Sequence, residues 1–249
     1  MRTFLMSCLV VFFVAEAFAE SPEPPLDNKR VAIHTLVRED IFAGWMDQNM
    51  ERFERGEKNI ELLLEQRPTE RAGLVAWKGG AKLYRAVLAL EAGDKDAFQK
   101  VYDEAVANLD EAKKLGPKNP AVAAVVGGSY LTFGDRLPEE LRANAFNQAY
   151  DNYQILWSQQ GKLLERLPVH IRGELLAGLV QSAQRTGRAK EYDEYLEKII
   201  QVLPDTGYQR EALKWKSDPQ AAATGSISCK SCHADGRLES RLAAINEKK

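Results

Sequence analysis

Residues 125–135, VVGGSYLTFGD, form an almost wholly apolar stretch that contains three glycines and an aromatic pair. Gly127, Tyr130 and Gly134 follow one another at intervals of three and four residues. Intervals of this length place side chains on one face of an α-helix, whereas a strand would alternate every second residue. The stretch therefore predicts a packed helix that ends at the turn Gly134-Asp135.

The chain on both sides of this stretch has the same helical character. Over residues 28–216 apolar residues recur three and four apart, and no convincing alternation of strand type is present. Glycines at 56, 93, 134 and 187 each follow one apolar periodic run and precede another. A glycine at such a point supplies the left-handed backbone conformation that ends a helix. We therefore predict four helix-turn-helix units, with turns at Gly56, Gly93, Gly134 and Gly187.

Two of the predicted helices repeat one spacing of packing residues. Each carries three residues at intervals of four and three and a proline five residues further on, just past the predicted helix end. The two sets are Ala105, Leu109, Ala112 and Pro117, and Tyr192, Leu196, Ile199 and Pro204. Together with the spacing of Gly127, Tyr130 and Gly134, this pattern resembles the tetratricopeptide repeat.

The resemblance is best over residues 120–135 and 173–206, and the Trp-Leu-Gly run of the family is missing. It implies an all-α fold of stacked helical hairpins, a solenoid of about four units with a concave groove that holds a partner's peptide or helix. An irregular helical bundle without a groove is the alternative. We expect three regions: a signal peptide over 1–19, a helical-repeat domain over 20–216, and a linker with a C-terminal tail over 217–249.

The first nineteen residues have the features of an export signal. Arg2 precedes an apolar run, and Ala17-Phe18-Ala19 provides a cleavage site before Glu20. A membrane anchor is less consistent, because Glu16 interrupts a run that is short for a bilayer. Lipid attachment at Cys8 would leave almost no apolar region before the cysteine. We therefore expect a periplasmic or secreted protein with no membrane span after cleavage.

Residues 226–237, SISCKSCHADGR, carry the chemistry that the sequence predicts. Cys229, Cys232 and His233 match the CxxCH attachment signature of c-type cytochromes, in which two thioethers hold the haem and the histidine binds iron. Two cysteines three apart lie on one side of a helical turn, so both reach the same edge of a porphyrin. The sequence predicts one covalent haem c, with His233 as the proximal iron ligand.

Other readings of the cysteine pair fit the chain less well. A redox dithiol has no thioredoxin-like strand and helix around it, and a structural zinc site needs four ligands. A plain disulfide between Cys229 and Cys232 leaves His233 without a role. The late position of the motif is similar to that in the class II cytochromes, although Gly236 stands where that family has an aromatic residue.

The sequence does not decide which residue is the sixth iron ligand. His170 follows Pro168 at a predicted helix start, where the helix dipole favours a neutral imidazole. His34, Met46 and Met50 are the other donors, and each has an alternative role in packing. An open or externally supplied position is the remaining possibility. Tyr208, Leu213 and Trp215, around a short helix expected from Tyr208 to Lys216, are candidates to cover the haem.

Three functions are compatible with these features. The first is an exported monohaem cytochrome that transfers electrons to a protein redox partner, and the second is an adaptor whose groove binds a peptide while haem is structural or sensory. The third is an open-site haem protein that binds or converts a small molecule, so enzymatic activity is undecided. A formal charge of −2 argues against a nucleic-acid partner. A homodimer is compatible with the sequence.

Overall fold

A computed structural model of the chain describes residues 23–224 and 237–247. Within these ranges the protein consists of eleven α-helices and three short 3-10 helices, without a strand. The α-helices are α1 (Ile33–Asp47), α2 (Met50–Gln66), α3 (Arg71–Glu91), α4 (Lys95–Leu115), α5 (Pro120–Phe133), α6 (Glu139–Gln160), α7 (Val169–Arg185), α8 (Ala189–Val202), α9 (Gly207–Ser217), α10 (Pro219–Thr224) and α11 (Arg237–Asn246). The predicted all-α class is therefore confirmed.

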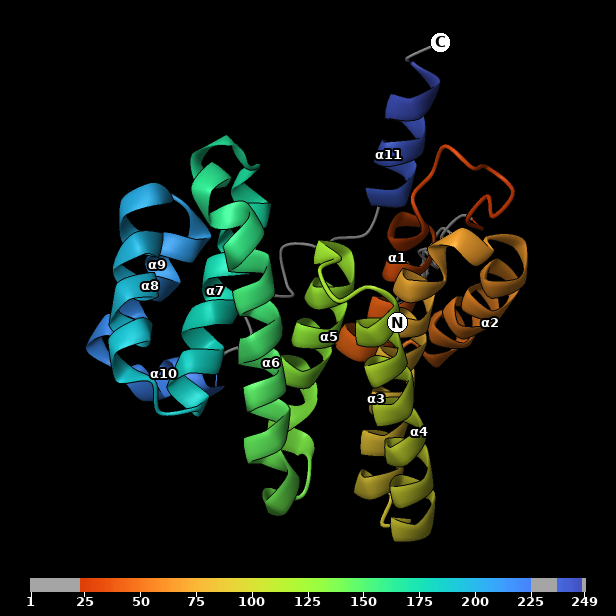
Figure 1. The fold of residues 1–249 in the computed structure, drawn as a ribbon, viewed down its shortest axis with the longest axis horizontal. Helices are drawn as coiled ribbons and strands as arrows, with labels where there is room; N and C mark the ends of the chain where they lie inside the picture. The colour runs from red at the N-terminus through yellow and green to blue at the C-terminus, as the bar shows by residue number, and fades with distance from the viewer. Residues whose placement is uncertain (1–22, 225–236, 248–249) are drawn as a thin grey trace, which may run out of the picture.

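The helices pack mainly against their neighbours along the chain. The hairpin partners are α1 with α2, α3 with α4, α5 with α6, and α7 with α8 (Figure 1). Contacts between α3 and α5 and between α6 and α7 join successive hairpins. The buried side chains of these helices belong to one continuous hydrophobic core.

Two of the four predicted turn glycines end helices as expected. Gly93 and Gly187 have φ angles of 81° and 69°, values that a residue with a Cβ rarely adopts. At Gly93 the next residue, Asp94, donates its backbone N–H to the Ala89 carbonyl at 2.9 Å, and its side chain caps α4. These glycines therefore form the turns of the second and fourth hairpins.

The prediction was wrong at Gly56. This glycine lies inside α2, and a methyl group there would lie 3.0 Å from Ile41 Cδ1, so its missing side chain lets α1 approach. The first hairpin turns instead at Gln48, whose φ of 57° places it in the left-handed region, and Asn49 caps the next helix. A sequence pattern that marks glycines does not distinguish a helix end from a helix contact.

Gly134 marks the predicted turn but has a different physical role. Its φ of −54° is right-handed, and it begins the 3-10 helix Gly134–Arg136. A Cβ at this position would lie 2.5 Å from the Phe146 ring of α6. Glycine is therefore required by the close packing of the third hairpin, and not by a left-handed backbone.

The repeated spacing in α4 and α8 produces the packing that it predicts. All six non-proline residues of the two sets are buried. Helix α4 ends two residues before Pro117, and α8 ends two residues before Pro204. The short helix expected near residues 208–216 is present as α9.

The region expected as a linker is partly helical. Pro219–Thr224 form α10, which packs against α7 and α9, and Ala222 is buried there. Residues 225–236 lie outside the described residues, and α11, which follows them, packs against α1 (Figure 1). The last described helix therefore contacts the first, about 200 residues away in sequence.

Candidate functional site

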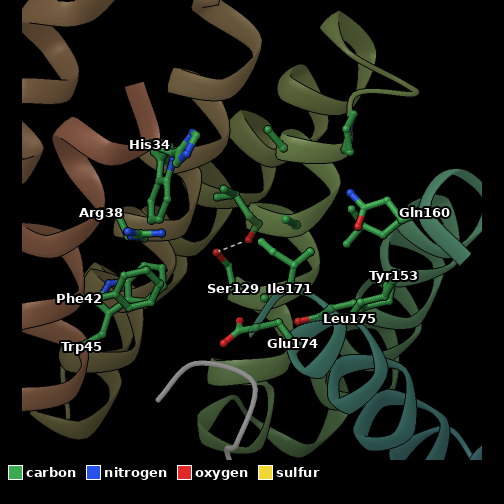
Figure 2. A pocket seen from close by; sticks show the side chains of 17 residues that line it. His34, Arg38, Phe42, Trp45, Ser129, Tyr153, Gln160, Ile171, Glu174 and Leu175 are labelled. Carbon is green, nitrogen blue, oxygen red and sulfur yellow. Dashed lines mark hydrogen bonds between the residues drawn. The ribbon is translucent and has the colours of Figure 1, made fainter. Parts of the chain in front are cut away.

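A cavity of about 420 Å³ lies between α1, α3, α5, α6 and α7. Figure 2 shows the side chains that line it, with His34 and Arg38 on the α1 side and Tyr153, Glu174 and Leu175 on the opposite side. Its volume falls in the range of about 300–1,000 Å³ that is usual for small-molecule and cofactor sites. The cavity is therefore the candidate binding site of the described chain.

Helix α1 contributes one stripe of side chains to the cavity. His34, Arg38, Phe42 and Trp45 follow at intervals of four, four and three residues, which keeps them on one helix face. Phe42 stands edge-on to both Trp45 and Trp77, with ring centroids 4.6 and 5.6 Å apart. The stripe therefore combines an aromatic wall with two nitrogen-bearing side chains at its N-terminal end.

The indole of Trp45 is a further feature of this wall. The side chain lies almost wholly inside the protein, and its Nε1 has no hydrogen-bond partner among the described residues. A buried N–H without an acceptor is uncommon in native proteins. The Trp45 N–H could therefore donate a hydrogen bond to an acceptor that is not among the described residues.

Helix α5 leaves room for the cavity because its facing residues are small. Five of them follow the i, i+3, i+4, i+7, i+8 pattern of one helix face. They are Ala121, Ala124, Val125, Gly128 and Ser129. A Cβ at Gly128 would have only Tyr153 Oη within 4 Å, at 3.9 Å, so this position borders open space.

The wall formed by α6 and α7 is held by a close approach between them. Tyr153 of α6 fits because Gly178 of α7 has no side chain, since a Cβ there would lie 2.1 Å from the ring. Leu156 and Leu175 extend this wall with apolar surface. Glu174 adds one carboxylate, whose Oε1 lies 3.5 Å from the Tyr208 hydroxyl.

His34 stands at the edge of the cavity, where part of its side chain remains exposed. Desolvation by the surrounding protein lowers the pKa of its imidazole below 6.5, and the positive charges of Arg38 and Arg241 lower it further. Glu70 acts in the opposite direction with a smaller effect. The lowered pKa favours the neutral form of the imidazole, which is the form that coordinates a metal.

Helix α11 is fixed beside this end of α1. The Leu238 backbone N–H donates to Glu39 Oε2 at 2.8 Å, and Arg30 Nη2 donates to the Ile245 carbonyl at 2.7 Å. Leu238 is buried, and Arg241 is close enough to His34 to affect its pKa. The chain that follows the CxxCH motif is therefore anchored one to two turns from His34.

Helix α10 is fixed on α7, beyond the residues of α7 that line the cavity. The Ala222 carbonyl accepts hydrogen bonds from Arg185 Nη1 at 2.9 Å and from Gln181 Nε2 at 3.3 Å, both on α7. The two anchors therefore lie on α7 and α1, the helices that form opposite walls of the cavity. Cys229, Cys232 and His233 belong to residues 225–236, which lie outside the described residues.

The other predicted ligands are not at the cavity. His170 lies in the first turn of α7, as expected from Pro168, but it does not line the cavity. Met46 and Met50 pack against the core and line no part of the cavity either. Met46 and Met50 lie on α1 and α2, on either side of the turn at Gln48.

The expected haem covers are also elsewhere. Tyr208 and Trp215 are buried in the packing of α9, Leu213 is exposed, and none of them lines the cavity. The lining residues Arg38, Phe42 and Trp45 were not among the predicted site residues. Their spacing from His34 was a visible signal, because the four residues form one stripe of a predicted helix.

Comparisons of the chain with protein-family models, with curated proteins and with solved structures found no match. In the described ranges, no cluster of three or more His, Cys, Asp or Glu side chains is suited to hold a metal ion. No helix there is both long enough and apolar enough to cross a membrane.

Proposed function

We propose that the protein is an exported monohaem c-type cytochrome that transfers electrons, with its haem seated in the cavity between α1 and α7. Cys229 and Cys232 would hold the haem through thioethers, and His233 would be the proximal iron ligand. When bound, the haem supplies one-electron chemistry between ferrous and ferric iron. The protein supplies the shelter, the second axial position and the surface for a redox partner.

The observation that carries this proposal is the position of the two chain anchors. His233 is five residues from Leu238, which is held on α1, and Cys229 is five residues from Thr224, which ends α10 on the α7 side. Five residues span at most about 18 Å. The segment that carries the motif therefore joins two helices, α10 and α11, which contact α7 and α1, and both α7 and α1 contribute residues to the cavity.

The lining of the cavity fits a haem. A porphyrin is a flat and largely apolar plate, so its burial needs apolar walls that exclude water. Phe42, Trp77, Leu156 and Leu175 supply such walls, and the small face of α5 leaves a gap between them. Imidazole is a preferred ligand of haem iron in its neutral form, and the lowered pKa of His34 favours that form at the cavity edge.

We assign the sixth ligand to His34 in preference to His170. Of the two histidines only His34 lines the cavity, and desolvation together with the charges of Arg38 and Arg241 lowers the pKa of its imidazole. A histidine pair at the iron gives a low-spin centre whose coordination does not change on electron transfer. Such a centre favours electron transfer over the binding of small molecules.

The scaffold and the compartment complete the proposal. The four helical hairpins are consistent with tetratricopeptide-like stacking that presents the haem edge to a protein redox partner. The signal peptide over residues 1–19, outside the described residues, would direct the chain to the periplasm or to secretion. The proposal requires export, because haem is attached to CxxCH motifs after export.

The first experiment tests attachment. We would express the full chain with a c-type maturation system and measure the mass of the mature protein. We expect an N-terminus at Glu20 and a mass gain of one haem that persists after denaturation and acid extraction. The Cys229→Ala, Cys232→Ala chain should show no gain. Retention of a covalent haem by that variant, or its absence from the wild type, would overturn the proposal.

The second experiment tests the seat and the ligand by absorption spectroscopy. His34→Ala should convert a low-spin spectrum to a high-spin one, whereas the matched variant His170→Ala should leave it low-spin. Gly128→Leu should keep the covalent haem but change its spectrum, because the new side chain occupies the space beside α5. If Gly128→Leu leaves the spectrum unchanged, the haem lies elsewhere.

A further inference from the structure

Positive charge is concentrated at one end of the cavity. Arg38, half-buried on α1, lines the cavity, and its side chain extends from α1 toward the interior (Figure 2). Arg241 approaches the same end from α11, which packs against α1, and both charges act on His34. The α1 and α11 end of the cavity is therefore a cationic mouth, defined by Arg38 and Arg241.

The described residues with which α6 and α7 line the cavity carry a negative charge and no positive one. Glu174 is the acidic side chain that lines the cavity, and it comes from α7, across the cavity from Arg38 (Figure 2). Most of the remaining lining is aromatic or aliphatic. Glu39 and Glu70 are near the cationic mouth, but Glu39 accepts a hydrogen bond from the Leu238 backbone and does not line the cavity.

We propose that Arg38 binds a carboxylate of the ligand in this cavity, which on the proposed function is a haem propionate. This inference rests on the proposed function and extends it to the orientation of the haem. The carboxylate edge of the porphyrin faces the cationic mouth, and its apolar edge faces the α6 and α7 wall that carries Glu174. The opposite orientation would place two propionates against a carboxylate.

The chemistry of arginine suits this role. The planar guanidinium of arginine can donate two parallel hydrogen bonds to a carboxylate, and arginine is charged at physiological pH. Arg38 lies one helical turn from His34, so one stripe of α1 contributes both an iron ligand and a carboxylate partner. Exposed Arg241 adds long-range attraction at the same end.

The test uses metal-free protoporphyrin IX and its dimethyl ester, which lacks free carboxylates. Both are titrated into the full mature chain carrying Cys229→Ala and Cys232→Ala, and binding is followed by quenching of tryptophan fluorescence. Neither probe has iron, so histidine ligation does not contribute. Arg38→Gln should weaken binding of the free acid about tenfold, because a charge-assisted hydrogen bond is lost. Binding of the ester should not change.

A matched control removes the same charge elsewhere. Arg71 lies on the surface in an ion pair with Glu111, so Arg71→Gln should leave both titrations unchanged. Equal weakening of both probes by Arg38→Gln, or no weakening of either, would overturn the inference.

The outcome is separable from that of the proposed function. If the thiol-free chain binds no porphyrin at all, the inference fails, while a covalent haem in the wild type would still sustain the cytochrome assignment. If no covalent haem is found but the free acid binds through Arg38, the cavity is a site for a flat carboxylate ligand and the cytochrome assignment fails.

Discussion

The adjacent glycines of α5 should respond in opposite ways to the addition of one methyl group. In a helix interior, alanine is more favourable than glycine by about 0.5–1 kcal/mol. At Gly128 the new Cβ would have no neighbour closer than Tyr153 Oη at 3.9 Å, so nothing offsets this gain. We expect Gly128→Ala to raise the free energy of unfolding by about that amount.

At Gly127 the same methyl group meets α6. Its Cβ would lie 3.2 Å from Asn152 Cβ and 3.3 Å from the Ala149 carbonyl oxygen, which is closer than ordinary van der Waals contact. Overpacking of this kind costs about 1–3 kcal/mol, which equals or exceeds the gain in helix propensity. Gly127→Ala should therefore lower the free energy of unfolding by up to about 2 kcal/mol, and the two variants should differ by about 1–3 kcal/mol.

Urea denaturation of the haem-free Cys229→Ala, Cys232→Ala chain, followed by circular dichroism, measures both changes without a contribution from haem. If the same variants are compared by thermal unfolding, a change of 1 kcal/mol in the free energy of unfolding corresponds to about 2–4 °C in Tm for a domain of this size. If both variants are equally stable, or if Gly128→Ala is the less stable one, the cavity beside α5 and the contact between α5 and α6 are not as described.

Three further changes test the packing and electrostatics of the site. The pKa of His34 is lower in the folded chain than in the unfolded chain, so the unfolded state takes up the proton first. The free energy of unfolding should therefore fall as the pH drops below 6.5. In the haem-free chain, His34→Gln should reduce this loss, as measured by urea titrations at pH 5 and 7.5. Asp40, 2% exposed, accepts hydrogen bonds from Arg55 at 2.6 and 2.7 Å. Asp40→Asn removes the charge of this partly buried ion pair and should lower the free energy of unfolding by about 1–3 kcal/mol in denaturant titrations, and an unchanged midpoint would contradict the pairing. Gly178→Ala should destabilise the chain by about 1–3 kcal/mol because it displaces the Tyr153 ring, and a smaller effect in the Tyr153→Ala background would confirm that this contact is the cause.

Local features of the sequence determined the secondary structure well. The three-and-four spacing of apolar residues predicted an all-helical chain, and the spacing in α4 and α8 correctly identified buried faces and the prolines beyond them. Gly93 and Gly187 were recognised as turns because a left-handed backbone is a property of the residue itself. The CxxCH motif, likewise a local pattern, carries the haem prediction, which remains to be tested.

The position of the cavity was decided by tertiary structure alone. Gly56 appeared to be a turn and is a helix contact, because only the approach of α1 gives its missing side chain a function. His34 and His170 were equivalent candidates in the sequence, and the tertiary packing separates them, because His34 lines the cavity and His170 does not. Helix periodicity states which face of each helix is buried, but it does not state which helices meet. Contacts such as that of Leu238 with Glu39 join residues 199 positions apart, and they form only when the whole chain has packed.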